Sequence, residues 1–200
     1  MGIMSGAMTF KAYFVEGYDF QNIDYNELLS KLNRGIFKEI NKERGEKESF
    51  GFADSRDIFS LEIDFNHTFY DNYVYFNFRR DILKLQKSVI NHYMKEIEKT
   101  FKRKVTKREL KEIKARAEAK YIKEVFPTVA SYEVVWNLET GILYFFTQSR
   151  ALNEKFTEWF ERNLELELTE IETATFAAKF LNDEELKNFE KVSPSSLMNV

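Results

Sequence analysis

Apolar and polar residues alternate along several segments of this chain, which is typical of strands with one buried face. Residues 59–65 give the clearest example, because Phe59, Leu61, Ile63 and Phe65 are separated by polar side chains. Residues 73–78 are apolar at odd and even positions alike, so we expect that strand to be buried more deeply. The sequence predicts strands over residues 10–15, 36–40, 49–52, 59–65, 73–78, 130–136 and 142–147.

Between these strands the apolar residues recur every three or four positions, which is typical of helices with one face against a core. Asp24 with Glu27, and Thr106 with Glu109, are spaced as in the capping boxes that begin helices. Pro127 marks the end of the longest helical region. We expect helices after Asp24, over residues 85–101 and 106–125, from Ser149, and around Phe176 and Leu186.

These elements predict an α+β fold in which one or more antiparallel sheets pack against amphipathic helices. A long helical hairpin over residues 82–126 is expected to project from the sheet. We expect residues 9–172 to form one α+β region, and residues 173–200 to form acidic C-terminal helices with a polar tail. The chain is 44% hydrophobic and holds twenty phenylalanines, which is enough apolar material for a sizeable core.

The composition also indicates the compartment. No apolar run is long enough to cross a membrane, and residues 1–8 lack the basic and apolar regions of a signal peptide. The chain has no cysteine, which fits a reducing compartment or a hot habitat where thiols are a liability. The absence excludes thiolate catalysis and cysteine-based zinc sites. We therefore expect a cytoplasmic protein that does not associate with a membrane.

Charge is distributed unevenly along the chain. Between Lys95 and Lys123 there are twelve basic and five acidic residues, which gives a local charge of +7. The whole chain carries −3, so the remainder carries −10, much of it after Ala151. A cluster of Lys and Arg on a projecting helical pair can neutralise phosphates and release their counterions.

The same pattern has two other interpretations. Glu98 with Lys102, and Glu112 with Arg116, are four residues apart, as in the ion pairs of an ordinary solvated helix. Such pairs cannot neutralise seven surplus positive charges, and this surplus favours a binding role. Alternatively, the chain is an interaction or scaffold protein whose basic hairpin docks on an acidic protein surface, such as the acidic C-terminal region of a second copy.

The order of several segments resembles that of a known family. An opening strand reads MTFKAYFVEG, and a short later segment reads SFGFAD. Residues 103–127 read RKVTKRELKEIKARAEAKYIKEVFP, and residues 131–164 read SYEVVWNLETGILYFFTQSRALNEKFTEWFERNL. In this order they are similar to the first strand, the basic interhelix turn with its proline-terminated helix, and the Trp-containing hairpin of the recombination-associated RdgC family. The resemblance spans about residues 9–172.

This resemblance implies a protein that binds double-stranded DNA without strong sequence preference and restrains strand exchange driven by RecA. It also implies a nucleoid location and a ring-like homodimer whose basic inner surface encircles the duplex. Five residues match the family's basic stretch, namely Arg103, Lys104, Lys107, Arg108 and Lys111, and Lys102 and Lys114 adjoin it. Their expected role is to neutralise phosphates without reading bases.

A metal-dependent nuclease is the remaining alternative, because two-metal hydrolysis needs several converging carboxylates. Asp54, Asp57, Glu62 and Asp64 lie close in sequence, and Glu62 and Asp64 share the polar face of a predicted strand. Solvation explains such a polar face without a site. We therefore predict a binding protein rather than an enzyme, with no catalytic or metal-binding residue, no cofactor and no small-molecule substrate.

Two further sets of side chains carry weaker signals. Tyr73, Tyr75 and Tyr144 are candidates for stacking on unpaired bases, but they lack interleaved basic residues, so duplex binding is favoured. His67 and His92 are far apart in sequence and lack the spacing of metal ligands, so we expect surface or turn residues.

Overall fold

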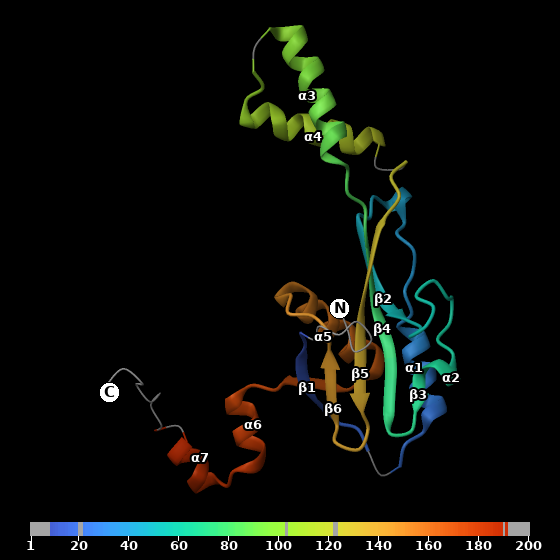
Figure 1. The fold of residues 1–200 in the computed structure, drawn as a ribbon, viewed down its shortest axis with the longest axis vertical. Coiled ribbons are helices and arrows are strands. Elements are labelled where there is room, and N and C mark those ends of the chain that lie inside the picture. The colour runs from blue at the N-terminus through green and yellow to red at the C-terminus, as the bar shows by residue number, and fades with distance from the viewer. Residues whose placement is uncertain (1–8, 20–21, 103, 122–123, 190, 192–200) are drawn as a thin grey trace.

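The computed structural model describes residues 9–19, 22–102, 104–121, 124–189 and 191 (Figure 1). It has the predicted α+β class. The strands are β1 (Lys11–Glu16), β2 (Glu48–Ala53), β3 (Phe69–Tyr70), β4 (Tyr73–Ile82), β5 (Thr128–Asn137), β6 (Ile142–Phe145) and β7 (Glu167–Glu170). The helices are α1 (Tyr25–Arg34), the 3-10 helix η2 (Lys42–Arg44), α2 (Phe65–Thr68), α3 (Lys87–Phe101), α4 (Lys107–Tyr121), α5 (Arg150–Leu164), α6 (Thr173–Phe180) and α7 (Asp183–Phe189).

Six strands form an antiparallel sheet in the order β2-β4-β5-β6-β1-β7, and the short β3 pairs with the start of β4. The sheet curls like half a barrel (Figure 1). Its longest pairing joins β4 to β5 over ten residues each, from Tyr73 opposite Asn137 to Ile82 opposite Thr128. β4 leads into α3, and α4 leads into β5, so this pair of strands connects the helical pair α3–α4 to the sheet.

The main core lies between one face of the sheet and the helices α1 and α5. Phe156 and Phe160 of α5 are fully buried, as are Phe78 and Phe145 of the sheet. The rings of Phe145 and Phe156 are stacked with their centres 4.2 Å apart. The alternating apolar side chains of the central strands therefore point from this face into the core, as the two-residue period of a strand requires.

The opposite face of the sheet is covered in part by the loop that follows β2. Arg79 of β4 lies there between the rings of Phe37 and Phe59, at 4.0 and 4.6 Å from their centres. Its guanidinium donates to both carboxylate oxygens of Asp81, at 2.8 and 2.7 Å, and to the carbonyl of Ile58. Arg79 is thus a buried charge with a bidentate partner, and it fixes the loop to the sheet.

The predicted strand over residues 59–65 is wrong, since this segment is a loop that ends in the N-terminus of α2. The polar side chains that alternate with the apolar ones bind nearby backbone N–H groups. Asp57 accepts from Phe59, Ser60 from Glu62, and Asp64 from Asn66. Such local bonds compete with strand pairing and favour turns. As a result Leu61 is 92% exposed.

The predicted long projecting hairpin is also not what the structure shows. Two separate fifteen-residue helices lie beyond the ends of β4 and β5, where α4 crosses α3 (Figure 1). Among the described side chains of these helices, Ile113 is the one fully buried residue. A long antiparallel hairpin would need a continuous buried apolar seam, which the described residues do not provide.

Several local predictions are confirmed. The Asp24 carboxylate accepts from the backbone N–H groups of Asn26 and Glu27 and begins α1, which ends at Gly35. Short helices lie around Phe176 and Leu186, as expected. The strand predicted over residues 36–40 reduces to a single parallel bridge between Ile36 and Phe52, and β7 was not predicted.

Within the part of the chain that the structure describes, no helix has both the length and the apolar character needed to cross a membrane.

Candidate nucleic-acid interface

The helical pair α3–α4 is organised around the break between its two helices. Lys102 ends α3 with the left-handed backbone conformation, at φ 52°. A reciprocal capping box begins α4, in which the backbone N–H of Thr106 donates to Glu109 at 2.9 Å and that of Glu109 donates to the Thr106 hydroxyl at 3.4 Å. The carboxylate of Glu98 accepts from the backbone N–H of Val105 at 3.1 Å. These contacts fix the break at the position where the basic residues gather.

The C-terminal end of α4 meets the middle of α3 at a pair of tyrosines. The Tyr93 hydroxyl donates to the Tyr121 hydroxyl at 2.9 Å, and the ammonium of Lys120 lies 5.0 Å from the centre of the Tyr121 ring. Hydrogen bonds from Tyr93 and Lys120 lower the pKa of Tyr121, whereas the same bond to Tyr121 raises the pKa of Tyr93. Hydrogen bonding to the two tyrosines likewise raises the pKa of Lys120. Lys120 is exposed and is protonated at neutral pH like any exposed lysine, and the hydrogen bonds to the two tyrosines strengthen this preference.

The predicted phosphate-contacting residues are exposed wherever the structure describes them. This holds for Lys102, Lys104, Lys107, Arg108, Lys111 and Lys114. Arg103 lies outside the described residues. Lys107, Lys111 and Lys114 are spaced by four and three residues along α4, so they lie on one face of the helix. We call these three residues the α4 lysine stripe.

Most of this positive charge is not neutralised locally. Arg108 has an ion pair with Glu112, at 3.8 Å, between strongly exposed side chains. Lys102, Lys107, Lys111 and Lys114 form no ion pair with any described residue. Glu98 and Glu109 bind the backbone N–H groups of Val105 and Thr106. The carboxylates of Glu98 and Glu109 at the helix break thus cap backbone groups, and the four lysines named above have no carboxylate partner among the described residues.

The site prediction included Lys102 but omitted Lys95 and Lys99, which form a second row of lysines with it on α3. Lys95, Lys99 and Lys102 are spaced by four and three residues and are all exposed. Their spacing repeats that of the α4 lysine stripe, so the same helical periodicity test applied to basic residues would have found them.

The carboxylates considered for a nuclease do not converge. The Asp54 side chain is 1% exposed and accepts from the backbone N–H groups of Arg56, Asp57 and Asp64 at 2.8, 3.0 and 3.0 Å. His67 Nδ1 lies 3.1 Å from one of its oxygens. Burial raises the pKa of Asp54, but these N–H groups and His67 outweigh it and hold the pKa below its ordinary value of 3.8. Asp54 is thus an anchor for the loop.

The other acidic residues of this loop are also unsuited to a metal. Asp57 and Asp64 bind backbone N–H groups, and Glu62 is exposed. Among the described residues, no three His, Asp or Glu side chains form a group that could hold a metal ion. His92 is exposed and lies 3.4 Å from Glu96 on the same helix, far from His67.

The candidate stacking tyrosines lie on the less covered face of the sheet. Tyr73 is 38% exposed, and Tyr75 and Tyr144 are half-buried on either side of Val135. Tyr70 adds a fourth ring, 5.5 Å from that of Tyr75. Burial, followed by the neighbouring Tyr73 and Tyr70, raises the pKa of Tyr75. The rings of Tyr70 and Tyr73 pack edge to face and tilted against that of Tyr75, which is typical of a self-supporting aromatic cluster. Tyr144 packs edge to face against Phe10 instead.

No protein-family model matches this chain, and the search of curated proteins finds no match either. The resemblance to the RdgC family therefore stays a hypothesis based on the order of segments.

Proposed function

We propose that this protein binds double-stranded DNA without reading its sequence, and that α3 and α4 contact the phosphates. In this proposal it is a binding protein rather than an enzyme. It acts in recombination or replication at the nucleoid, in the manner of the RdgC family, as a homodimer that modulates RecA. The observation that carries the DNA-binding role is the α4 lysine stripe, whose three ammonium groups have no carboxylate partner among the described residues.

The length of the stripe suits a duplex. Lys107 and Lys114 are seven residues apart, which is about 10 Å along a helix axis. One strand of a duplex presents a phosphate about every 3.4 Å along its axis, so about three phosphates lie within that length. Lys95, Lys99 and Lys102 supply a second row on the neighbouring helix. We propose further that the pair acts as a projecting element, which its position beyond the ends of β4 and β5 supports.

The decisive experiment measures affinity for a labelled duplex against salt concentration. For the variant Lys107→Glu, Lys111→Glu, Lys114→Glu we expect the slope of log K against log salt to fall by about two to three, because each phosphate contact contributes about 0.9. We expect no change of preference between unrelated duplex sequences, since the contacts carry no base readout.

A matched control separates local from global charge. Lys38, Lys187 and Lys191 are exposed lysines outside the helical pair, and changing all three to glutamate alters the net charge by the same amount. We expect this control to keep most of the salt slope. If both variants bind alike, the α4 lysine stripe is not the interface, and if the unaltered protein does not bind duplex DNA, the proposed function is wrong.

One observation favours the second candidate, an interaction protein. Five apolar side chains of α3 are only half-buried, namely Val89, Ile90, Tyr93, Met94 and Ile97. Such a face can be covered by another protein. A salt-sensitive complex with an acidic protein surface, formed without any affinity for DNA, would favour this candidate over the first.

A further inference from the structure

The sheet ends at β7, which pairs with β1 along one of its two sides. The backbone N–H of Ile171 donates to the carbonyl of Ala12 at 2.8 Å, so the odd-numbered residues of this segment bond to β1. The backbone groups of Leu168 and Glu170 therefore point away from the sheet. Such an edge can pair with a strand of another chain.

Two of these four outward backbone groups are already bonded to side chains. The Glu161 carboxylate of α5 accepts from the N–H of Leu168 at 3.2 Å, and the Thr175 hydroxyl donates to the carbonyl of Glu170 at 2.8 Å. The carbonyl of Leu168 and the N–H of Glu170 have no hydrogen-bond partner among the described residues. An antiparallel neighbour bonds to both groups of one residue, so it would have to break one of the side-chain contacts. A parallel neighbour bonds to the carbonyl of one residue and the N–H of the residue two positions on, which is the open pair here.

The opposite edge of the sheet contains a bridge of this parallel kind. Phe52 of β2 donates to the carbonyl of Gly35 at 2.8 Å and accepts from the N–H of Phe37 at 2.7 Å. One residue of an extended segment thus satisfies a carbonyl and an N–H that are two positions apart. The edge at β7 presents the same two groups, and no described residue takes the place that Phe52 has at the other edge.

A groove with a volume of about 740 Å³ lies along this edge, between β7 and α5. Leu168 and Glu170 line it from the strand, and Glu161 lines it from the helix. The buried Tyr13 and Asn153 also line it, and the Tyr13 hydroxyl donates to the Asn153 side chain at 2.6 Å. The open backbone groups of β7 therefore border a space that can receive the side chains of an added strand.

The lining of the groove is acidic. It holds five glutamates and two basic residues, which gives a local charge of −3. Each of the two basic residues is paired with one of the glutamates. Glu161 and Glu172 form no ion pair with a described residue, since Glu161 holds the N–H of Leu168 and Glu172 is the N-cap of α6. The charge of the groove thus favours a partner with Lys or Arg side chains.

We propose that this groove binds an extended, basic segment of a partner protein, which adds to the sheet parallel to β7. The central residue of that segment donates to the carbonyl of Leu168 and accepts from the N–H of Glu170. The residues before and after it point their side chains to the α5 side of the sheet, where lysines or arginines meet Glu161 and Glu172. In this mode main-chain bonds give affinity and alternate side chains give specificity. The inference goes beyond the proposed DNA binding and does not depend on it.

The first test titrates the full DNA-free chain, labelled with nitrogen-15, with the peptide acetyl-Val-Lys-Val-Lys-Val-amide and follows the amide of Glu170 by NMR. We expect this amide to shift and saturate as it gains an acceptor. The same peptide N-methylated at its central valine keeps every charge but lacks the donor to Leu168, so its dissociation constant should be at least about tenfold higher. N-methylation at the first lysine is the matched control. Its amide points away from β7, so the dissociation constant should stay within about threefold.

The second test concerns the charges. Glu161→Gln and Glu172→Gln each remove one negative charge and keep an oxygen that can accept a hydrogen bond. Each should raise the dissociation constant of the unmodified peptide about threefold and weaken its dependence on salt. Glu167→Gln is the matched control, because Glu167 is exposed on β7 but its side chain points to the other face of the sheet. This variant should bind the peptide unchanged.

Three results would overturn the site. If the peptide leaves the Glu170 amide unshifted, the edge does not accept a strand. If the peptide methylated at the central valine binds as tightly as the unmodified one, the attraction is only ionic. If the Glu170 amide shifts with protein concentration alone, a second copy occupies the groove. The variant altered at Lys107, Lys111 and Lys114 should bind the peptide unchanged, so failure of DNA binding and failure of this site are distinguishable.

Discussion

Replacing Asp54 with alanine should destabilise the protein strongly, although the residue lies in a loop. The Asp54 carboxylate is the common acceptor for three backbone N–H groups, and it also faces His67. Alanine would leave all these donors without their acceptor in a place that is largely closed to water. Two of the backbone donors, of Arg56 and Asp57, bind one oxygen, and the donor of Asp64 binds the other.

The size of the effect follows from these bonds. A hydrogen bond to a charged group contributes about 1.5–3 kcal/mol. The lower end of that range for three backbone bonds, reduced by the cost of burying a charge, gives a loss of about 3–4 kcal/mol for Asp54→Ala. Asp54→Asn should cost about 2 kcal/mol, because Oδ1 keeps its two donors while the new amide faces the N–H of Asp64.

Urea unfolding measures this loss as a shift of the midpoint at constant slope. Asp57→Ala is the control, since Asp57 is exposed and binds a single backbone N–H, so it should cost about 1 kcal/mol or less. Hydrogen exchange should also quicken at the amides of Arg56, Asp57 and Asp64 in Asp54→Ala. The reasoning fails if Asp54→Ala costs no more than the control.

Two further predictions concern the same loop and its neighbouring strand. Because the folded pKa of Asp54 is lowered, its contribution to stability is present above the unfolded pKa and is lost as the pH falls through the folded value. The stability difference between the unaltered protein and Asp54→Asn should therefore narrow below about pH 4, and a constant difference in acid unfolding would contradict this. Gly51→Ala should cost about 3 kcal/mol, because its Cβ would lie 2.3 Å from the Cα of Phe37, whereas Gly45→Ala meets nothing within 4 Å and should cost about 1 kcal/mol for its positive φ. Thermal or urea unfolding of the two glycine variants measures both losses of stability, and the loss for Gly51→Ala should be clearly the larger.

The elements that could be predicted from sequence are those whose signals are local. Asp24 and Thr106 begin helices because their side chains bind backbone groups two or three residues away. The strand prediction over residues 59–65 failed for a related reason, since Asp57 and Asp64 also bind backbone groups nearby and turn the chain there. Alternation indicates which side chains are apolar, but it does not reveal that the polar ones compete for the backbone.

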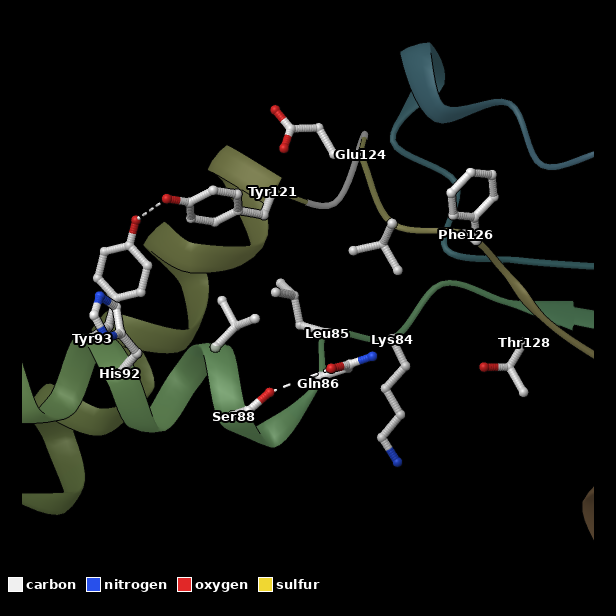
Figure 2. A pocket seen from close by; sticks show the side chains of 12 residues that line it. Lys84, Leu85, Gln86, Ser88, His92, Tyr93, Tyr121, Glu124, Phe126 and Thr128 are labelled. Carbon is white, nitrogen blue, oxygen red and sulfur yellow. Dashed lines mark hydrogen bonds between the residues drawn. The ribbon is translucent and has the colours of Figure 1, made fainter.

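The elements that could not be predicted depend on distant partners. β7 is a four-residue polar segment that becomes a strand because β1 is free to pair with it, from Tyr13 opposite Glu170 to Glu16 opposite Glu167. Phe126 is a second example, because a phenylalanine is expected to be buried and only the arrangement of β5 and α4 leaves it in water. It borders a cleft of about 720 Å³ between the start of α3 and the segment that follows α4 (Figure 2). The cleft is formed by segments some forty residues apart, so no sequence window contains it.

The charge of the helical pair depends on the sequence and on the contacts that the fold gives each acidic residue. The sequence places twelve basic and five acidic residues between Lys95 and Lys123 but does not say how each acidic residue is used. In α5 the glutamates Glu154 and Glu158 pair with arginines one turn away, at 2.9 and 2.7 Å. At the break between α3 and α4, by contrast, Glu98 and Glu109 accept backbone N–H groups. A carboxylate that caps a helix still carries its charge, but its hydrogen bond to the backbone fixes it at the helix end. It therefore cannot move with a flexible lysine side chain to keep an ion pair. Under the proposed function, the lysines on the faces of α3 and α4 would exchange their counterions for phosphates without first breaking an ion pair. The paired arginines of α5 would first have to leave their glutamates.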